Sequence, residues 1–242
     1  MADTIVDAAR LLKASSKTIA LTGAGVSTES GIPDFRSRDG LWSRFDPMEY
    51  GTLGAFQRDP EKVWTMLAEL MSLIDARPNA GHYVMAEMEE SGVLAGIITQ
   101  NIDSLHQKAG SKRVVEYHGS LDSFTCLQCE SSFPIAEVRK LVLPPRCDTC
   151  GEFLKPDIVF FDEQIPPSAL SETRGLVQQA DLLLVAGTSC QVMPAAVIPA
   201  TLLAQGGKII EVNREPVLST QAEVVLEGSF ARLMSQLAEA LR

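Results

Sequence analysis

A glycine-rich segment near the N-terminus has the composition of a phosphate-binding turn. It follows residues 17–21, a short apolar run typical of a buried parallel strand, and reads TGAGVSTES. Glycines at 23 and 25 would let a phosphate group approach the backbone, and the turn after them could open a helix whose N-terminus attracts anions. The dinucleotide fingerprint is incomplete, because Thr28 replaces its third glycine. A simple strand-to-helix connection therefore stays an equal alternative.

A loop with three kinds of functional side chain follows this turn. Residues 31–36 read GIPDFR, and Gly31 and Pro33 would end the helix. The loop would then carry a carboxylate, an aromatic ring and a guanidinium beside the expected phosphate site. It could fold over a bound nucleotide.

Four of the five cysteines form two Cys-x-x-Cys pairs, Cys126 with Cys129 and Cys147 with Cys150, separated by 17 residues. This spacing is typical of a four-cysteine zinc site. Two such pairs complete a tetrahedron of thiolates with no open position, so we expect one structural Zn²⁺. Disulfides are the alternative, which the expected reducing compartment disfavours. Cys190 is left unpaired and is expected to pack as a small buried hydrophobe.

Residues 120–156 around these cysteines look like a small inserted module. A nucleic-acid-binding zinc ribbon is one function for such a module, but residues 121–156 are poor in basic side chains and contain several acidic ones. The formal charge of −10 and the pI near 4.8 also argue against binding to a phosphate backbone. An acidic surface would favour basic partners such as lysine-rich protein segments, or would simply maintain solubility.

One of the three histidines occupies a position suited to catalysis. His82, near a helix start, and His106, on a short helix, are expected to have packing or capping roles. His118 lies at the end of an expected strand and could act as an acid or base near pH 7. Its position alone leaves catalytic and structural roles equally open.

The elements that position these residues alternate between strands and helices, which predicts a Rossmann-like, doubly wound parallel sheet. The polar run at 100–103 directly follows one strand, and functional residues of such sheets lie at the carboxyl ends of strands. The expected strands are residues 17–21, 94–99, 113–117, 156–161, 181–186, 208–212 and 223–226, and the expected helices are 3–14, 59–76, 80–90, 105–109, 168–179, 195–204 and 229–241.

Length and composition indicate an ordinary globular protein. The 242 residues, of which 45% are hydrophobic, suit one sizeable domain or a large domain with a small insertion. The N-terminal segment lacks the features of a signal peptide, and no apolar run approaches the roughly 20 residues of a membrane span. We expect a cytoplasmic monomer without membrane contact.

Seven motifs occur in collinear order along essentially the whole chain. They are GAGVSTESGIPDFR from residue 23, TQNID at 99–103, His118-Gly119, the paired Cys-x-x-Cys motifs, KPDIVFFDE at 155–163, GTS at 187–189, and Val212-Asn213. Together these motifs resemble those of the sirtuins, which are NAD-dependent protein-lysine deacylases.

The resemblance implies two domains, with NAD and acyl-lysine meeting in the cleft between them. A Rossmann-like NAD-binding domain would comprise residues 1–44, 77–119 and 157–242. A smaller domain would combine a helical insertion at 45–76 with the four-cysteine zinc module at 120–156. The implied fold is thus a doubly wound parallel sheet with a smaller zinc-binding and helical domain.

Carried over to matching positions, the resemblance also implies the NAD contacts. Phe35 would shield the nicotinamide-ribose region, and Gln100 would contact ribose. Ile102 and Asp103 would hold the nicotinamide carboxamide. The remaining contacts would be Ala24, Thr28 and Arg36 along the NAD site, and Thr188, Ser189 and Asn213 on the phosphate and adenosine-ribose side.

The chemistry of the family assigns catalytic roles to two residues. The acyl-lysine oxygen is a weak nucleophile, so it must be held close to the ribose carbon from which nicotinamide departs. His118 would then deprotonate a ribose hydroxyl, and Asn101 would orient substrate or water. The products would be nicotinamide, O-acyl-ADP-ribose and free lysine.

The resemblance places an acyl-lysine peptide against Val159, Phe161 and Val192, and the acyl group near Leu67 and Leu70. Relatives that prefer malonyl or succinyl groups carry Tyr and Arg at the positions of these two leucines. The pocket is therefore expected to accept acetyl or longer apolar acyl groups and to exclude acidic ones, because a carboxylate would be buried unpaired. Both leucines could instead be core residues, which is compatible with the same pocket.

One position departs from the family pattern. Asp162 stands where the family usually has glycine, in the segment that pairs with the substrate peptide as an added strand. This aspartate puts the peptide-binding geometry in question, and it would favour basic residues beside the target lysine.

Two other functions remain open. The same cleavage of NAD could transfer ADP-ribose to a protein nucleophile, and the sequence separates this reaction poorly from deacylation. A third possibility is an NAD-sensing module without turnover. Intact His118 and Asn101 disfavour it, because a pure binder needs no base at the ribose.

Overall fold

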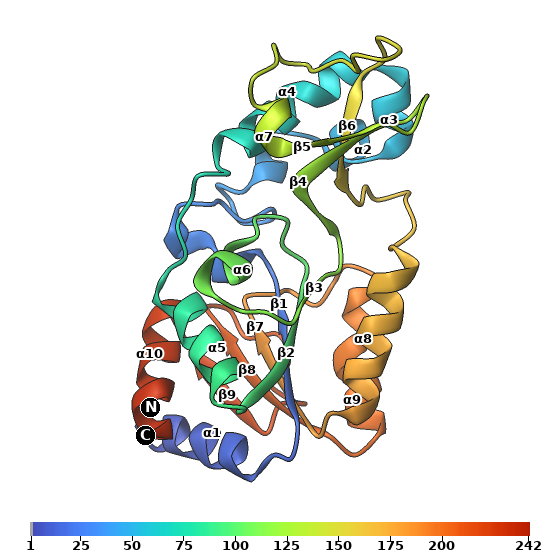
Figure 1. Ribbon diagram of the computed structural model, residues 1–242. Helices are drawn as coiled ribbons and strands as arrows, with labels where there is room; N and C mark the ends of the chain where they lie inside the picture. The colour runs from blue at the N-terminus through green and yellow to red at the C-terminus, as the bar shows by residue number, and fades with distance from the viewer. Residues whose placement is uncertain (1) are drawn as a thin grey trace.

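A parallel sheet forms the centre of the larger of two lobes (Figure 1). This computed structural model describes residues 2–242, with side chains from residue 4 onward. The six strands run in the order β3-β2-β1-β7-β8-β9, and every neighbouring pair is parallel. They are β1 (Thr18–Thr22), β2 (Leu94–Thr99), β3 (Val114–Glu116), β7 (Leu182–Ala186), β8 (Lys208–Asn213) and β9 (Val224–Glu227).

The strand order reverses at β1. This strand pairs with β2 on one side and with β7 on the other, so that Thr22 lies opposite both Thr99 and Ala186. Open parallel sheets bind ligands at such a switch point, in the crevice beyond the carboxyl ends of the strands. The segments that follow β1, β2 and β7 therefore converge on one place.

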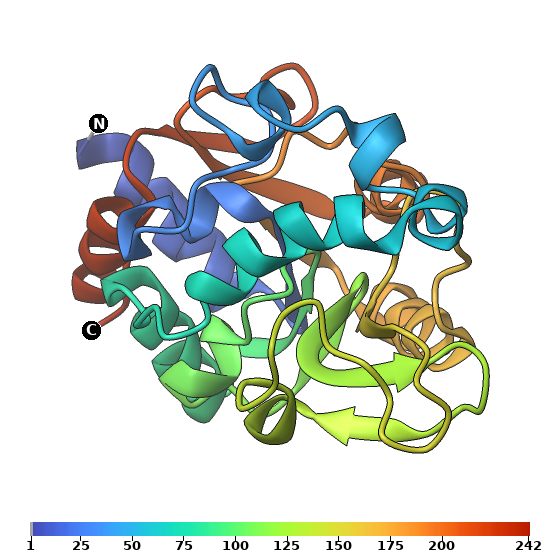
Figure 2. The ribbon, with the colours of Figure 1, turned by 90° about the horizontal axis from the view of Figure 1, so that it is seen from above.

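The smaller lobe combines two distant segments of the chain. Its antiparallel sheet, ordered β5-β4-β6, lies beside the helical segment that contains α4 (Figure 2). Trp64 joins the two parts: its Nε1 donates to the carbonyl of Leu154 at 3.0 Å, and its ring stacks on Phe124. The elements are α2 (Pro47–Tyr50), α3 (Leu53–Arg58), α4 (Pro60–Ser72), β4 (Gly119–Cys126), β5 (Ser132–Pro134), α7 (Ile135–Val138) and β6 (Leu154–Ile158).

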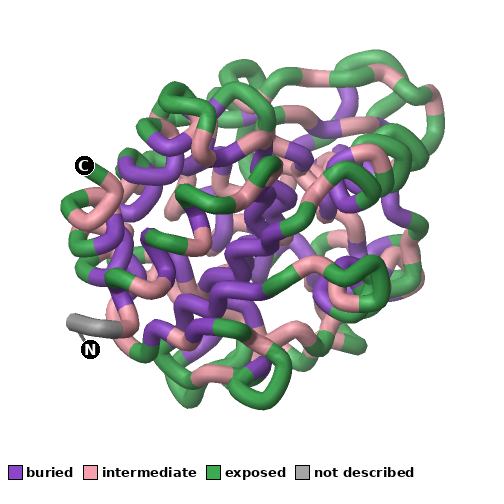
Figure 3. Tube along the Cα trace, turned by 90° about the horizontal axis from the view of Figure 1, so that it is seen from below, coloured by how far each residue is buried: buried purple, intermediate pink, exposed green. Residues whose placement is uncertain are grey.

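Buried residues are concentrated along the strands and the inner faces of the helices (Figure 3). One cluster joins the parallel sheet to α1, α5 and α10, and a second joins its other face to α8 and α9. The expected Rossmann-like, doubly wound sheet is confirmed. No helix within residues 2–242 is long and apolar enough to cross a membrane. The helices of the larger lobe are α1 (Ala2–Ala14), α5 (Ala80–Glu90), α6 (Leu105–Ala109), α8 (Pro167–Gln179), α9 (Ile198–Ala204) and α10 (Phe230–Leu241).

Two expectations about local structure are wrong. The strand expected at 156–161 does not join the parallel sheet, because β4 offers it an antiparallel partner and β6 pairs there instead. The domain boundary placed between residues 156 and 157 consequently falls inside β6. No regular helix opens after Gly25: two 3₁₀ turns, Ala24–Val26 and Thr28–Ser30, end at Gly31, whose φ of 85° is left-handed.

Candidate active site

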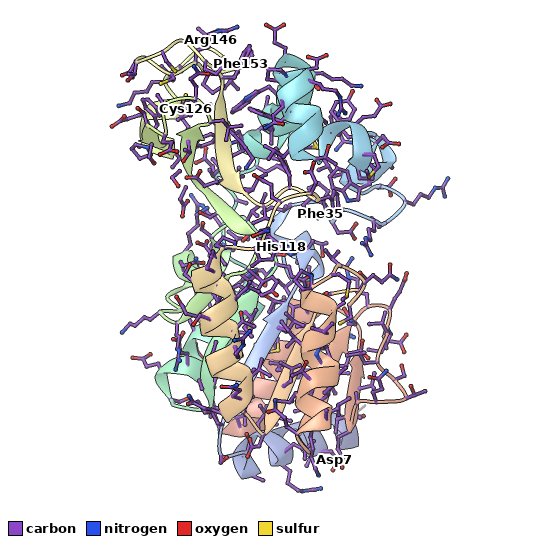
Figure 4. The ribbon with its side chains drawn as sticks, turned by 90° about the vertical axis from the view of Figure 1, so that its right-hand side faces the viewer. Asp7, Phe35, His118, Cys126, Arg146 and Phe153 are labelled. Atoms are coloured by element: carbon purple, nitrogen blue, oxygen red, sulfur yellow. The ribbon has the colours of Figure 1, made fainter. Side chains whose placement is uncertain are left out.

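A cleft of about 1080 Å³ receives residues from both lobes. It includes residues that follow β1, β2, β7 and β8 in the larger lobe, together with residues of α4 and of the segment after β6. Figure 4 shows the labelled Phe35 and His118 at the junction of the two lobes. The volume slightly exceeds the roughly 300–1,000 Å³ typical of ligand pockets.

The structure brings most of the predicted site residues together in this cleft. Asp103, Asp162 and Leu67 are not among the residues that line it. Those that do are Ala24, Thr28, Phe35, Arg36, Gln100, Asn101, Ile102, His118, Thr188, Ser189 and Asn213, with Leu70, Val159, Phe161 and Val192 on the expected substrate side.

Two glycine turns contact each other where β1 and β7 end. Gly25 N donates to the carbonyl of Gly187 at 2.9 Å, and a Cβ on Gly187 would lie 2.4 Å from Val26 N. The φ of Gly187, 58°, is also one that other residues rarely adopt. These turns can approach so closely only because both residues lack side chains. The same property leaves the backbone accessible to an anionic group in the cleft.

His118 has one ring nitrogen fixed and the other free. Its Nδ1 lies 3.2 Å from the carbonyl oxygen of Gln100, and because a carbonyl only accepts, Nδ1 carries the proton. Nε2 of the neutral ring is then a lone-pair acceptor. Burial lowers the pKa of His118, and the hydrogen bond to Gln100 opposes this shift only in part. The ring is therefore neutral near pH 7 and can take a proton at Nε2.

The residue after His118 must be glycine. Gly119 has a φ of 71°, and a Cβ there would lie 2.0 Å from the carbonyl oxygen of Asp157. The backbone of β4 thus passes directly against β6 at the point where the chain leaves His118. Val159 N also donates to the carbonyl of His118 at 2.9 Å, which ties the segment after β6 to the histidine.

A chain of hydrogen bonds orients Asn101. Its Nδ2 lies 3.1 Å from Ser27 Oγ, which donates to Asp103 Oδ2 at 2.7 Å. The other carboxylate oxygen of Asp103 accepts from Leu105 N. Asp103 thus supports Asn101 through Ser27, although it is not itself among the residues that line the cleft.

The loop after the first turn crosses the cleft. Arg36 Nη1 donates to Gln191 Oε1 at 2.6 Å and to Ser189 Oγ at 3.1 Å. The ring of Phe35 packs against Trp42, with centroids 5.4 Å apart, and Trp42 packs in turn against Phe161. The loop therefore supplies an aromatic wall and a cation next to the turn that follows β7.

The segment after β6 is fastened to the helical part of the smaller lobe. Phe161 N donates to the carbonyl of Gly51 at 2.9 Å. Asp162 accepts hydrogen bonds from Leu53 N and Gly54 N, the first backbone groups of α3. These bonds lower the pKa of Asp162 against the opposing effect of desolvation. The aspartate binds the N-terminus of α3, and its two oxygens are occupied there.

A largely buried ion pair closes the same segment. Lys155 Nζ lies 2.9 Å from Glu163 Oε2 and also donates to the carbonyls of Pro156 and Ile158. Glu163 accepts in addition from Phe160 N at 2.8 Å. The Lys155 ammonium thus has three acceptors, and Glu163 Oε2 receives both the ammonium and a backbone N–H, as nearly buried charges require.

The apolar end of the cleft is formed by α4. Leu70 lines it, whereas Leu67 is fully buried in the core of the smaller lobe, and Met66 takes its place in the cleft wall. The wall here is therefore apolar, although one of its two α4 residues differs from those expected.

The four cysteines of the smaller lobe lie close together. Their Sγ atoms all lie within 4.8 Å of one another, with Cys126 and Cys150 3.4 Å apart and Cys129 and Cys147 3.5 Å apart. A disulfide is about 2.05 Å long, whereas thiolates about 2.3 Å from a tetrahedral Zn²⁺ are separated by more than 3 Å. The donors fit a structural zinc ion. Cys190 is only partly buried, and desolvation raises the pKa of its thiol to about 11.

The other two histidines have the expected structural roles. His82 completes a capping box at α5, where its Nδ1 accepts from Asn79 N, and His106 Nε2 lies 3.0 Å from Thr22 Oγ1. Burial lowers the pKa of His82 to about 4 and that of His106 to about 3. Both rings are neutral parts of the core.

Several cleft residues were missed by the sequence analysis. Trp42 lies outside the expected strands and helices, and Met66 lies within the expected helix at 59–76, where no motif singles it out. Arg214 and Glu215 directly follow β8, and Gly228 directly follows β9. The rule that ligands bind at the carboxyl ends of parallel strands would have found these last three.

Comparisons with known proteins agree with this geometry. A model of the Sir2 family matches residues 23–194. The chain is 44% identical to NAD-dependent protein deacylase 1 of Archaeoglobus fulgidus, over 96% of this chain and 97% of that protein. It is 40% identical to an NAD-dependent protein deacetylase of Thermodesulfovibrio yellowstonii, over 96% and 93%.

Solved structures are similar over nearly the full length. A Sir2 homologue in complex with NAD has a TM-score of 0.90 at 43% identity and covers 98% of this chain and 93% of that chain. A Sir2 variant with a deacetylated p53 peptide and 3′-O-acetyl-ADP-ribose has a TM-score of 0.92 at 36% identity, with 96% of each chain covered. Fold, motifs and sequence agree along the whole chain, which therefore belongs to the Sir2 family.

Proposed function

We propose that this chain is an NAD-dependent protein-lysine deacylase that releases nicotinamide, O-acyl-ADP-ribose and free lysine. The observation that carries the proposal is His118, whose ring is neutral, held at Nδ1 and free at Nε2 inside a cleft shared by both lobes. A general base must have a free acceptor within reach of substrate and a pKa below the working pH. His118 meets both conditions.

The cleft residues divide between NAD and substrate. NAD, when bound, supplies the ribose carbon that the acyl oxygen attacks as nicotinamide leaves. Phe35 would keep water from this carbon, Gln100 would contact the ribose, and Ile102 would contact nicotinamide, with Asp103 acting through Ser27. The phosphate and adenosine side would comprise Ala24, Thr28, Arg36, Thr188, Ser189 and Asn213.

His118 Nε2 would accept the proton of a ribose hydroxyl, so that the hydroxyl oxygen could attack the acyl carbon; the lysine amine would then leave with the help of water, and the acyl group would remain on ADP-ribose. Asn101, oriented by Ser27, would position substrate or water. Positioning contributes much of the rate in such a reaction, because the acyl oxygen is a weak nucleophile. The hydrogen-bonded supports of His118 and Asn101 serve this positioning.

The peptide would lie along Val159 and Phe161 and against Val192, and the acyl group would extend toward Met66 and Leu70. We expect acetyl and longer apolar acyl groups to fit and succinyl groups to be rejected, since no cation among the described residues of α4 lines this wall. Comparable turnover of succinyl-lysine and acetyl-lysine peptides would contradict this assignment. The protein partners of this site would thus be acyl-lysine proteins. From the composition we still expect the protein to be a cytoplasmic monomer that does not bind nucleic acid.

The test is mass spectrometry of the purified protein with NAD and an acetyl-lysine peptide. We expect peptide-dependent release of nicotinamide and formation of O-acetyl-ADP-ribose, both lost in His118→Ala, while the variant still binds NAD. ADP-ribose attached to protein would favour the transferase instead. Binding of NAD without any turnover would favour a sensor.

A further inference from the structure

A carboxylate is fully buried beside the cleft without a cationic partner. Glu211 on β8 has no exposed surface, and no ion pair to it occurs within residues 4–242. Its Oε1 accepts from Val217 N at 2.7 Å, and its Oε2 accepts from Leu218 N at 2.9 Å. A buried charge is tolerated only when hydrogen-bond donors surround it. Glu211 thereby holds the loop after β8, which contributes residues to the cleft.

The same carboxylate fixes the amide of Asn213. Asn213 Nδ2 donates to Glu211 Oε1 at 2.9 Å and to the carbonyl of Thr188 at 3.0 Å, so both amide hydrogens are used. A flipped amide would place its oxygen against a carboxylate and a carbonyl, both of which only accept. Asn213 lines the cleft, and its Oδ1 has no hydrogen-bond partner among the residues described. At this position Asn213 therefore presents a hydrogen-bond acceptor to the cleft, and not a donor.

We infer that Glu211 is a positioning residue that makes the site select NAD over NADP. The inference rests on the proposed function in one respect, that Asn213 faces the adenosine ribose. A 2′-hydroxyl can donate to Asn213 Oδ1. The 2′-phosphate of NADP is largely a dianion near pH 7, so it mostly lacks a proton to donate, and it brings additional negative charge toward a buried carboxylate.

The neighbouring charges do not reverse this selection. Arg214 and Glu215 directly follow Asn213 and also line the cleft, and their opposite charges offset each other. Arg36, which we assign to the phosphate side, is held by Gln191 and Ser189. Arg214 and Glu215 are exposed, whereas Glu211 and Asn213 are buried, and electrostatic interactions are weaker in water than in the interior. The fixed acceptor of Asn213 and the buried carboxylate of Glu211 both favour NAD over NADP.

The test compares the binding of three ligands by calorimetry in the absence of peptide: NAD, an NAD analogue lacking the 2′-hydroxyl of the adenosine ribose, and NADP. The wild-type protein should bind NAD about five- to tenfold more tightly than the deoxy analogue, as expected for one buried hydrogen bond. It should bind NADP more weakly still. In Glu211→Gln the negative charge is lost and one of the two acceptor oxygens becomes an amide donor that faces the donors of Asn213, Val217 or Leu218, so Asn213 is held less firmly and both preferences should shrink at least about threefold.

Glu223→Gln is the matched control, because Glu223 is an exposed carboxylate that pairs with Lys208 away from the cleft. It should leave all three affinities unchanged. Equal binding of NAD and NADP by the wild-type protein would overturn the inference, and so would unchanged preferences in a Glu211→Gln variant that still binds NAD.

If Glu211→Gln does not fold, Asn213→Ala provides the second variant. It removes the acceptor, so NAD and the deoxy analogue should bind it equally; a retained preference would overturn the inference. All of these experiments measure ligand binding. If the protein did not catalyse deacylation, it would still select NAD but would not turn over the peptide, so the two hypotheses can fail independently.

Discussion

At the scale of single residues, the three histidines of this chain differ in what surrounds them. His82 and His106 are enclosed by α5, α6 and β1, with ring centroids 4.9 Å apart. His118 contacts one carbonyl and lines the cleft. The sequence could not make this separation from position alone, because a strand end is equally suited to a structural histidine.

The pH dependence of turnover should reflect the protonation of His118. Its pKa is lowered, mainly by burial, and the base must be neutral to accept a proton. Activity should therefore rise with pH through a midpoint below the ordinary histidine value of about 6.5 and stay high above it. The measurement is kcat/KM for NAD between pH 4.5 and about 8, and an acid limb centred above 6.5 would contradict the prediction.

The pH dependence of stability should report the other two histidines. Their pKa values are lowered from 6.5 to about 4 and about 3, so the unfolded chain binds more protons than the folded chain below pH 6.5. Stability is fully present above 6.5 and is lost as the pH falls. Each ring should lower the free energy of unfolding by roughly 2 kcal/mol between pH 7 and 5.

Urea denaturation across this range measures the loss. His106→Gln removes one titrating group but keeps a partner for Thr22, so its stability should depend less on pH even though it is lower at pH 7. Identical pH dependences in the two proteins would show that the buried rings are not responsible.

Sequence motifs and helix faces differ in how well they locate a side chain. The cysteines and His118 belong to short motifs with fixed spacing, and the structure brings the cysteines together and places His118 in the cleft. Leu67 and Leu70 are expected on a helix, where a shift of one residue turns a side chain by about 100°. On α4 the structure places Met66 and Leu70 in the cleft wall and Leu67 in the core.

At the scale of elements, the segment after β6 depends on ties to the rest of the smaller lobe. Asp162→Gly removes two hydrogen bonds to the first turn of α3, and loss of such helix caps costs about 1 kcal/mol. We predict a slightly less stable enzyme whose preference among peptide sequences is relaxed, because the segment that we propose to contact the peptide is less fixed. An unchanged preference across a peptide panel would refute this.

The ion pair between Lys155 and Glu163 should contribute more to stability than the hydrogen bonds of Asp162 do. Lys155→Met leaves Glu163 without its cation, which should lower the free energy of unfolding by roughly 3 kcal/mol. We expect a raised KM for peptide with little change in NAD affinity, because the pair supports Val159 and Phe161 and does not contact the glycine turns. Lys62→Met, which breaks an exposed pair with Glu49, is the control and should change neither value. An equal loss of NAD binding in Lys155→Met would contradict the local role.

Most elements could be predicted from periodicity, since β2, α5 and β8 are bounded by clear composition changes. The strands with which each of them pairs could not be predicted in this way. The apolar residues at 156–161 indicate a strand but not the sheet to which it belongs. In the structure β6 pairs with β4 in the antiparallel sheet, and this tertiary pairing determines its place. Gly31 likewise ended a turn where the sequence predicted a helix.

At the scale of the whole molecule, zinc should stabilise one lobe selectively. Cys126, Cys129 and Cys147 lie in the cluster that includes α3, α4, β4 and β6, whereas the parallel sheet has its own two clusters. Removing zinc with a chelator should therefore abolish amide protection in β4, β6 and α4 and leave it in β1 and β7.

Hydrogen exchange measures this difference directly. Cys150→Ser should behave like the chelated protein and lose peptide turnover, while Cys190→Ser should retain its zinc content and its protection. Uniform loss of protection through both lobes would mean that the lobes do not unfold separately.

The aromatic packing of the smaller lobe has a spectroscopic consequence. Both tryptophans of the chain belong to its cluster: Trp64 stacks on Phe124 in the interior, and Trp42 lies between Phe35 and Phe161 at the cleft. Intrinsic fluorescence thus reports on this lobe and its cleft, while the parallel sheet contributes no indole emission. Quenching of Trp42 by a bound nucleotide can be followed against the constant signal of Trp64. Melting curves recorded by tryptophan emission describe one lobe, whereas curves recorded by circular dichroism describe both.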